Sequence, residues 1–271
     1  MKKYIACASL FLACTPFVAQ AQEAEGPISV SGSATLTSDY RFRGVSQTNK
    51  EMAIQGGLTV SHESGLYAGT WASNLAGWGT FGGSNMELDL YAGYAVPLGG
   101  VTLDVGLTWY MYPGGADTTD FAEPYVKLSG DVGPASLLLG VAYAPKQKAL
   151  GNVTPGAHPA AAPGDKEDNL YIWGDVSAGI PETPVTLKAH LGYSDGNPGL
   201  GPNGTSIAPT GKYFDWLLGA DVAVGPVTLG IAYVDTDIGK SEATALPGFS
   251  SSKDGSSISS SRVVLSATWG F

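Results

Sequence analysis

The end of the chain alternates between apolar and small or polar side chains. Val263, Leu265, Ala267, Trp269 and Phe271 alternate with Val264, Ser266, Thr268 and Gly270. A period of two is the period of a β-strand with one apolar face. The pattern predicts a strand that meets apolar surroundings on one side and water or a polar interior on the other.

Similar alternation recurs along the chain and predicts twelve strands. We expect them at residues 28–42, 51–62, 65–76, 85–97, 100–112, 120–131, 134–145, 168–180, 184–195, 212–225, 226–238 and 260–271. Each range reaches the roughly 9 to 11 residues that a tilted strand needs to cross a membrane. After Gln22 no apolar run reaches the about 20 residues of a membrane helix. A membrane-spanning form of this chain is therefore a β-barrel.

Short and long connections alternate between these strands. The short ones lie near residues 63–65, 97–100, 131–134, 181–184 and 225–226; the long ones lie near 43–51, 76–85, 112–120, 145–168, 195–212 and 238–260. Transmembrane barrels have short periplasmic turns and longer extracellular loops. The sequence thus predicts an all-β fold, an antiparallel transmembrane β-barrel of about 12 strands. A barrel of 10 or 14 strands and a soluble β-sandwich are the alternatives.

The start of the chain has the pattern of a secretory signal peptide. Lys2 and Lys3 precede an apolar run from Tyr4 to Val18, and Ala19 and Ala21 form an A-x-A cleavage site. We expect residues 1–21 to be removed on export and residues 22–271 to form a barrel in the outer membrane of a Gram-negative cell. A transmembrane helix, or a lipoprotein signal at Cys14, is the alternative.

Composition narrows the chemistry of the exported chain. Both cysteines, Cys7 and Cys14, precede the cleavage site, so no disulfide or thiolate is expected after it. The 24 acidic residues then face 12 basic ones, since Lys2 and Lys3 are also removed. This negative balance argues against a nucleic-acid partner.

Charged side chains on the predicted strands are out of phase with the apolar ones. An Arg or Lys that faces lipid at mid-depth costs about 2 to 4 kcal/mol, so we expect these side chains to face the lumen. The lumen-facing candidates are Asp39, Arg41, Arg43, Glu87, Asp89, Asp104, Glu123, Lys127, Asp175, Lys188, His190, Asp215, Asp221 and Arg262. Apart from His190 they comprise eight acids and five bases, which favours small cations if most of the excess is unpaired. Two interpretations stay open: water fills a narrow pore, which we prefer, or the charges pair and seal the lumen.

Aromatic residues on the apolar phase fall near the predicted strand ends. Such belts place amphipathic rings at the lipid headgroups. The predicted belt comprises Tyr40, Phe42, Trp109, Tyr143, Tyr193, Phe214, Trp216 and Tyr233 on the loop side, and Tyr94, Trp269 and Phe271 on the turn side. A cluster of core aromatics is the alternative.

Two segments carry a family resemblance. Residues 38–48, read as SDYRFRGVSQT, and residues 62–74, read as HESGLYAGTWASN, resemble the TorF family of porin-like outer-membrane proteins. Strand count and the final Phe271 extend the resemblance in outline over the mature chain. It implies a channel-like outer-membrane protein, and it supplies no substrate residue.

The sequence therefore predicts a porin-like channel for passive diffusion of small polar solutes or ions through a charged lumen. A closed structural or adhesion-type barrel is the alternative. Arg41 and Arg43 either form a basic step at the mouth or pair with neighbouring acids. We expect no enzyme, because His62, His158 and His190 are not placed beside a nucleophile at the outer rim. No cofactor or metal is expected; the expected partners are outer-membrane lipid, small solutes, and the barrel assembly machinery through the strand that ends in Phe271.

Overall fold

The computed structural model describes residues 26–151, 166–201 and 206–271. The predicted signal peptide and both cysteines lie outside the described residues, as does most of the predicted loop at 145–168. Among the described residues, no helix is long and apolar enough to cross a membrane.

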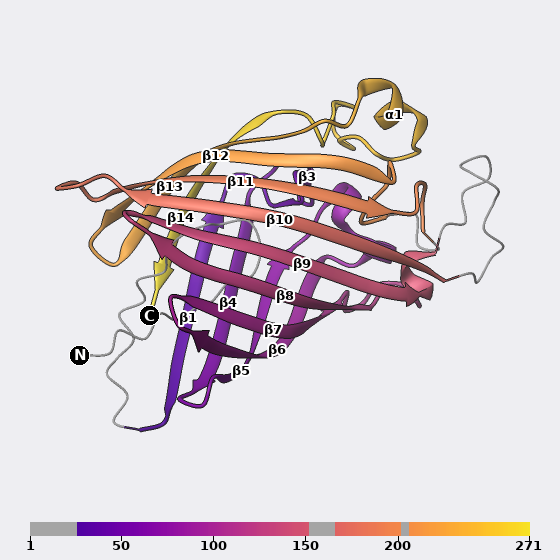
Figure 1. The fold of residues 1–271 in the computed structure, drawn as a ribbon. Coiled ribbons are helices and arrows are strands. Elements are labelled where there is room, and N and C mark those ends of the chain that lie inside the picture. Colours follow the sequence, from indigo (N-terminus) through magenta and orange to yellow (C-terminus); the bar gives the residue numbers. More distant parts are fainter. Residues whose placement is uncertain (1–25, 152–165, 202–205) are drawn as a thin grey trace.

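Twelve antiparallel strands close into one barrel (Figure 1). The wall strands are β1 (Ile28–Thr37), β4 (Ala53–His62), β5 (Leu66–Asn74), β6 (Met86–Leu98), β7 (Val101–Met111), β8 (Phe121–Val132), β9 (Ala135–Gln147), β10 (Glu167–Gly179), β11 (Val185–Gly196), β12 (Lys212–Val224), β13 (Val227–Thr236) and β14 (Arg262–Gly270). Each strand pairs with its neighbours in the chain, and β1 also pairs with β14, with Thr35 opposite Thr268. Closure satisfies the edges that an open sheet would leave unpaired. The predicted twelve-stranded antiparallel barrel is confirmed.

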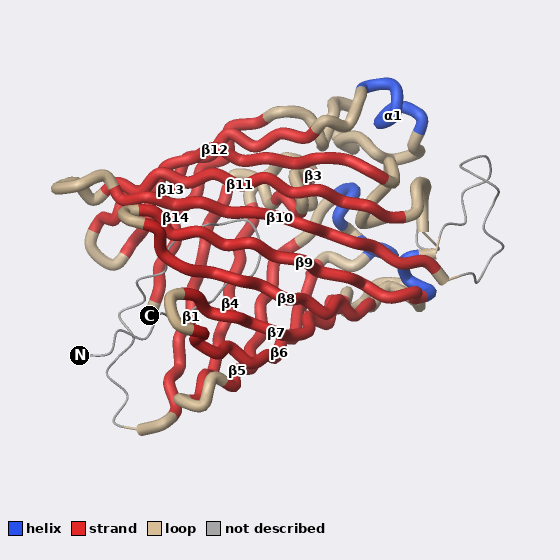
Figure 2. Tube along the Cα trace, viewed as in Figure 1, coloured by secondary structure: helices blue, strands red, loops and turns tan. Residues whose placement is uncertain are grey.

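The connections divide between two rims of the barrel. Short turns such as Gly99–Gly100, Gly133–Pro134 and Gly225–Pro226 gather at one end, together with the start of β1 and the end of β14; we call this end the turn rim (Figure 1). The long connections gather at the other end, the loop rim. They contain the short helices η1 (Gly77–Gly79), η2 (Phe81–Gly83), η3 (Lys148–Leu150) and α1 (Lys240–Ala245), which Figure 2 shows among the loops at that end.

The predicted first strand at 28–42 is wrong in its last part, from residue 38 to residue 42. The wall strand β1 ends at Thr37, and the chain then forms a small hairpin from β2 (Arg41–Phe42) and β3 (Val45–Ser46). Arg43 and Gly44 have φ angles of 47° and 79°. Two successive positive φ angles are the conformation of the tight turn that joins two-residue hairpins, so the chain reverses there and does not continue along the wall.

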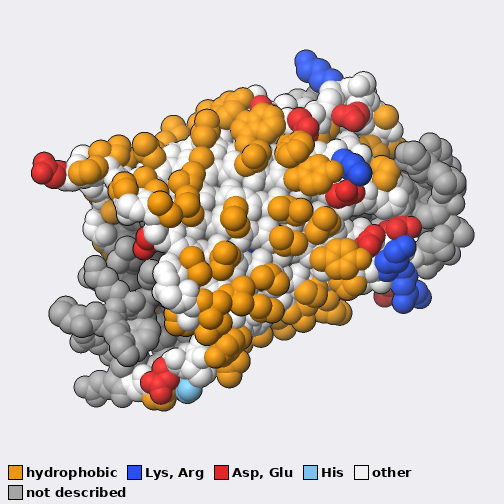
Figure 3. Space-filling model, in the orientation of Figure 1, with side chains coloured by type: hydrophobic (Ala, Val, Ile, Leu, Met, Phe, Trp, Pro, Cys, Tyr) orange, Lys and Arg blue, Asp and Glu red, His pale blue; other side chains and the backbone are white. Residues whose placement is uncertain are grey.

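The outer surface of the wall is apolar. Outward side chains include Leu139, 65% exposed, and Leu218, 61% exposed. Figure 3 shows hydrophobic side chains over the middle of the wall and charged ones toward its two ends. Soluble monomers rarely expose contiguous apolar surface of this extent. An apolar exterior around a polar interior is the arrangement of a transmembrane β-barrel.

Most aromatics of the predicted belt lie on this outer surface. Trp109, Tyr143, Phe214 and Tyr233 are 41–45% exposed near the loop rim, and Tyr94, Trp269 and Phe271 are 44–48% exposed near the turn rim; Tyr193 and Trp216 are partly exposed outward residues of β11 and β12. The assignment of Tyr40 and Phe42 to the belt is wrong. They are 3% and 7% exposed, because the chain leaves the wall after Thr37 and carries both rings into the lumen.

Candidate functional site: the loop-side half of the lumen

The predicted lumen residues fall into two groups. Glu87, Asp89, Asp104, Glu123, Lys127, Asp175, Lys188, His190, Asp215, Asp221 and Arg262 lie on wall strands at positions that alternate with the exposed apolar residues. Asp39, Arg41 and Arg43 also lie inside the barrel, although the chain has already left the wall there. All three are at most 3% exposed.

The segment Asp39–Asn49, which we call the inward hairpin, is buried at every residue. The Gln47 amide donates a hydrogen bond to the Tyr40 carbonyl at 2.7 Å, and the Tyr40 amide donates to Thr48 Oγ1 at 3.0 Å. At the tip, a side chain at Gly44 would overlap Thr236 of β13 and reach Asp215 of β12. Glycine therefore allows the hairpin to approach β12 and β13 closely.

Arg43 anchors the inward hairpin to two wall strands. Its Nη2 donates to both carboxylate oxygens of Glu123 on β8, at 2.7 and 2.8 Å. The guanidinium carbon lies 4.1 Å from the ring centroid of Tyr171 on β10 and 4.8 Å from that of Phe42. Aromatic faces attract a desolvated guanidinium, so these contacts hold the charge in place in addition to the ion pair.

Asp39 organises the base of the inward hairpin. It accepts hydrogen bonds from Arg41 Nε at 2.9 Å and Ser46 Oγ at 2.5 Å, and Arg262 Nε lies 3.6 Å away. Arg41 Nη1 also donates to the carbonyls of Gly44 and Ser260, both at 2.8 Å. Arg41 and Arg43 are thus both braced by acceptors inside the barrel.

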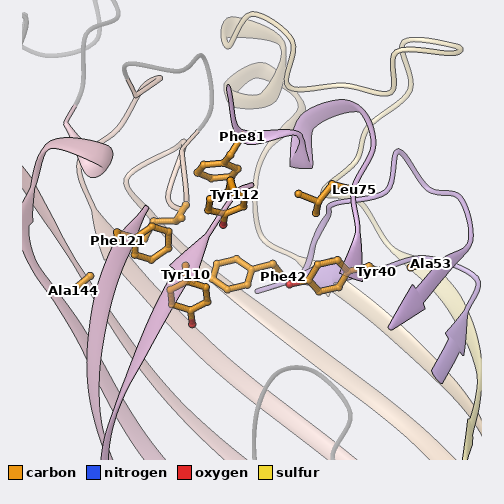
Figure 4. Packing of buried hydrophobic residues seen from close by; sticks show 10 residues of the cluster. Tyr40, Phe42, Ala53, Leu75, Phe81, Tyr110, Tyr112, Phe121 and Ala144 are labelled. Atoms are coloured by element: carbon orange, nitrogen blue, oxygen red, sulfur yellow. The ribbon is translucent and has the colours of Figure 1, made fainter. Parts of the chain in front are cut away.

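The loops of the loop rim pack over the inward hairpin. Figure 4 shows the largest buried cluster, in which Phe81 and Tyr112 from two loops lie above Phe42 and Tyr110. The Phe81 and Tyr112 rings stack at 4.5 Å, as do those of Tyr110 and Phe121. A second cluster joins Val45 to residues of four further segments: Trp78, Ala208, Tyr213, Phe249 and Ile258. These contacts close the loop-side mouth of the lumen.

Deeper in the lumen the charges pair between neighbouring strands. Lys127 contacts Asp104 and Lys188 contacts Asp221, each at 2.8 Å. The His190 ring lies between two carboxylates, with Nδ1 2.6 Å from Asp175 and Nε2 3.3 Å from Asp215. Each of these pairs joins two strands that are hydrogen-bonded in the wall, because a lumenal side chain reaches its cross-strand neighbour most easily.

Two acids differ from the rest. Among the described residues, Glu87 and Asp89 are the predicted lumen carboxylates that make no ion pair. Glu87 accepts hydrogen bonds from the Tyr40 hydroxyl at 3.0 and 3.2 Å. Asp89 is fully buried, and neither carboxylate oxygen has a hydrogen-bond partner within the described part of the chain. The lumen carboxyl groups without an ion pair therefore both lie on one strand, β6, near the loop rim.

The turn-side half of the lumen has a different lining. Next to the turn rim the inward residues are mostly small and partly exposed, and they include Ser29, Ser31, Ser33, Ser61, Gly93, Ser177, Thr228 and Gly230. The buried pairs Lys127–Asp104 and Lys188–Asp221 lie further in. Inward glycines also leave room for rings that lie against the wall, as Gly93 does for Tyr67. The wall is therefore partly exposed next to the turn rim, whereas the inward hairpin fills the lumen at the loop rim.

The inward hairpin and its aromatic contacts were missed in the sequence. Their one local signal is Gly44, since an Arg-Gly pair flanked by apolar residues suits a tight hairpin turn. The regular alternation of Tyr40 and Phe42 with charged residues continues the pattern of β1 and conceals the turn.

The fold and the lumen together define a transmembrane β-barrel with a closed loop-side mouth. The chain belongs to Gcw_chp, a family of bacterial proteins of unknown function, whose model matches residues 21–268. No curated protein sequence matches the chain. Neither finding carries the TorF name, so that resemblance stays a prediction.

Several solved structures resemble the barrel. A porin shares 12% identity over 90% of this chain and 100% of its own, with a TM-score of 0.43. An outer-membrane channel from Pseudomonas putida F1 shares 9% over 89% and 94%, with a TM-score of 0.42. Wzi from Escherichia coli, a carbohydrate-binding β-barrel involved in capsule assembly, shares 16% over 93% and 59%, with a TM-score of 0.38. At these values the likeness transfers neither a function nor a residue role to this chain.

Proposed function

We propose that this protein is an outer-membrane channel for small polar solutes or ions, closed in the described conformation by the inward hairpin. The observation that carries the proposal is the contrast inside the lumen. A partly exposed, polar lining lies next to the turn rim, buried ion pairs follow it on the wall, and a segment of the chain itself, Asp39–Asn49, occupies the lumen at the loop rim.

The chemistry of the wall around the inward hairpin supports a passage. Glu87, Asp89, Glu123 and Asp215 line this level of the barrel, and all are at most 3% exposed. Buried ion pairs are weak sources of stability, because well-packed apolar residues of similar volume often stabilise a core as well or better. A wall that served only as a core would gain nothing from these charges. A wall that faces water whenever the hairpin moves requires them.

A closed structural or adhesion-type barrel is the second candidate. The observation that favours it is the packing of the loop rim, where aromatic side chains from several loops contact the inward hairpin. In that case the polar lumen is a sealed core and the exposed loops carry the activity.

The decisive experiment removes the central part of the inward hairpin. Residues 41–46 are replaced by a short Gly-Ser linker in the mature chain, which is refolded in detergent and inserted into planar bilayers. We expect brief or rare openings from the unaltered barrel and steady stepwise conductance from the variant. A matched control replaces residues 240–245, the helix α1, which contributes no buried residue. This control should conduct like the unaltered barrel.

The result also separates the two candidates. Altered gel mobility before boiling shows whether the variant without residues 41–46 is folded. If this folded variant gives no conductance across a wide voltage range, the result contradicts the channel and favours the closed barrel. A purified mature chain that is soluble and monomeric without detergent contradicts the membrane location.

The remaining partners belong to the same proposal. The apolar band of the wall supports contact with outer-membrane lipid, with the loop rim facing outward. Recognition of the last strand by the assembly machinery stays a prediction, as does export through the secretory pathway.

A further inference from the structure

The connection between β13 and β14 contacts the inward hairpin at the loop rim. We call residues 249–260 of this connection the strap. The Ser46 amide of β3 donates a hydrogen bond to the Ile258 carbonyl at 2.9 Å, and Arg41 Nη1 of β2 donates to the Ser260 carbonyl at 2.8 Å. Both strands of the inward hairpin are therefore bonded to the backbone of the strap.

Apolar contacts hold the same two segments together. Val45 of the inward hairpin belongs to one buried cluster with Phe249 and Ile258 of the strap. Phe249 and Ile258 are 2% and 0% exposed, and the Phe249 ring meets the Trp78 ring edge-on at 4.7 Å between centroids. Separating the strap from the hairpin would return these side chains to water, which is unfavourable. The strap is thus packed onto the hairpin as well as hydrogen-bonded to it.

The exit of the inward hairpin is the strained part of this contact. Asn49 and Lys50 have φ angles of 57° and 62°, a left-handed conformation that residues other than glycine rarely adopt and that persists where neighbours hold it. The strap supplies such neighbours. The Ser252 amide donates to Asn49 Oδ1 at 2.9 Å, and Lys50 Nζ donates to Ser256 Oγ and lies 3.5 Å from Asp254 Oδ1. The strap therefore fixes the two residues at which the chain turns back toward β4.

The strap has one buried and one exposed side. Its tip, residues 252–255, is exposed at every position. Ser251 and Ser259 are 3% and 1% exposed, like the two apolar residues that pack onto the hairpin. One short segment thus joins the exposed surface of the loop rim to the segment that occupies the lumen.

We propose that the strap latches the inward hairpin, so that the hairpin leaves the lumen only after residues 249–260 have moved off it. The proposal rests on the channel function and names how the closed mouth is regulated. With the strap in place, outward movement of the hairpin leaves the Ser46 amide and the Ile258 carbonyl without partners in buried surroundings, which is costly. Once the strap has moved, water can replace these partners, and the population shifts toward the open barrel.

The test measures the fraction of time that single barrels conduct in planar bilayers. The strap is replaced in the mature chain by a Gly-Ser linker of the same length, which removes Phe249, Ile258 and the charged tip. We expect the open fraction to rise at least about tenfold over that of the unaltered barrel, because several hydrogen bonds and the apolar contacts are lost together.

The matched control replaces the helix α1, which lies in the same connection and contributes no buried residue. This control should conduct like the unaltered barrel. Gel mobility before boiling shows whether each variant is folded. A folded strap variant with an unchanged open fraction, or an equal rise in the α1 control, overturns the latch.

A point substitution tests the latch without altering the rest of the connection. Asn49→Gly removes the acceptor of the Ser252 amide and is compatible with the φ angle of 57°. We expect a severalfold rise in the open fraction, since one hydrogen bond corresponds to a factor of up to about ten in population. Glu182→Gly is the matched control, because Glu182 has a φ angle of 62° in an exposed turn at the turn rim. No rise in a folded Asn49→Gly barrel contradicts the latch, even if the linker variant does not fold.

The latch and the channel fail in different ways. A folded barrel that stays silent both without residues 41–46 and without the strap contradicts the channel itself. A barrel that conducts without residues 41–46 and keeps its original open fraction without the strap contradicts the latch alone.

Discussion

The lumen is lined differently near its two rims. Near the loop rim, Arg43 and Glu123 are almost fully buried, and the inward hairpin pairs them with each other. Near the turn rim, residues such as Ser31 and Ser177 are small and partly exposed. The comparison teaches that a polar barrel wall by itself does not define an open pore. Cross-strand ion pairs bury part of the lumen, and at the loop rim a further segment of the chain occupies it.

Barrel size explains why a segment of chain is needed for closure. Barrels of about 8 strands are filled by their own side chains, whereas barrels of about 16 leave an aqueous channel. Twelve strands lie between these limits. Side chains alone therefore leave the lining next to the turn rim partly exposed, and at the loop rim the inward hairpin brings backbone and rings into the lumen.

The largest effect is expected where the hairpin is anchored. Arg43→Met leaves the Glu123 carboxylate buried without its cation, and removing one partner of a buried pair costs about 3 to 5 kcal/mol. Urea unfolding in lipid vesicles, followed by tryptophan fluorescence, measures the loss. The double variant Arg43→Met/Glu123→Leu removes both charges and should recover most of the stability. A double variant that is less stable than Arg43→Met would show that the ion pair is not the anchor.

A smaller effect tests how tightly the loop-side half is packed. A side chain at Gly192 on β11 would overlap the Tyr171 hydroxyl and lie 2.6 Å from Asp215 Oδ2. Overpacking a filled site costs about 1 to 3 kcal/mol, so Gly192→Ala should lower the free energy of unfolding by that amount. Gly179→Ala at the turn-side end of β10 is the matched control, since a side chain there meets nothing within 4 Å. Equal losses from the two variants would remove the contrast in packing.

Much of the wall follows from the sequence because alternation reports directly which way each side chain faces. Val263 and Leu265 face outward and Val264 and Ser266 inward, as the period of two requires. The same rule fails at Tyr40 and Phe42. Both faces of the inward hairpin are buried inside the barrel, so polar and apolar residues alternate there without any lipid contact.

Pairing partners in the lumen were also beyond the sequence. Alternation assigns Asp104 and Lys127 to the same face, but their contact depends on the register between β7 and β8, in which they are directly opposite. Likewise, it becomes clear that Glu87 and Asp89 make no ion pair only after the other lumen acids have been matched to their cations. A count of lumen charges therefore overstates how many remain available to a passing ion.

An effect of similar size is expected at the hydroxyl that contacts Glu87. Tyr40→Phe removes the donor to Glu87, and leaving a buried acceptor without its hydrogen-bond donor costs about 1 to 3 kcal/mol. Tyr143→Phe is the matched control, because its hydroxyl also donates to a carboxylate, Asp168, but on the exposed outer surface. Urea midpoints of the two variants should differ clearly. A loss from Tyr143→Phe as large as that from Tyr40→Phe would contradict the role of burial.

The smallest effect is expected for an ion pair outside the lumen. Lys253 Nζ lies 2.7 Å from Glu51 Oε1, and both side chains are more than half exposed. The hydrogen bond and charge of Lys253 lower the pKa of the Glu51 carboxyl. A carboxyl with a lowered pKa in the folded state stabilises the fold above its ordinary pKa of about 4.3, and that contribution is lost as the pH falls.

Water and salt screen exposed pairs. Lys253→Ala should therefore leave the urea midpoint at pH 7 within the scatter of repeat measurements, with any small deficit disappearing at pH 3. A deficit at pH 7 comparable to that of Arg43→Met, or one that grows on acidification, would show that exposed and buried pairs contribute alike and would break the contrast between the lumen and the loops.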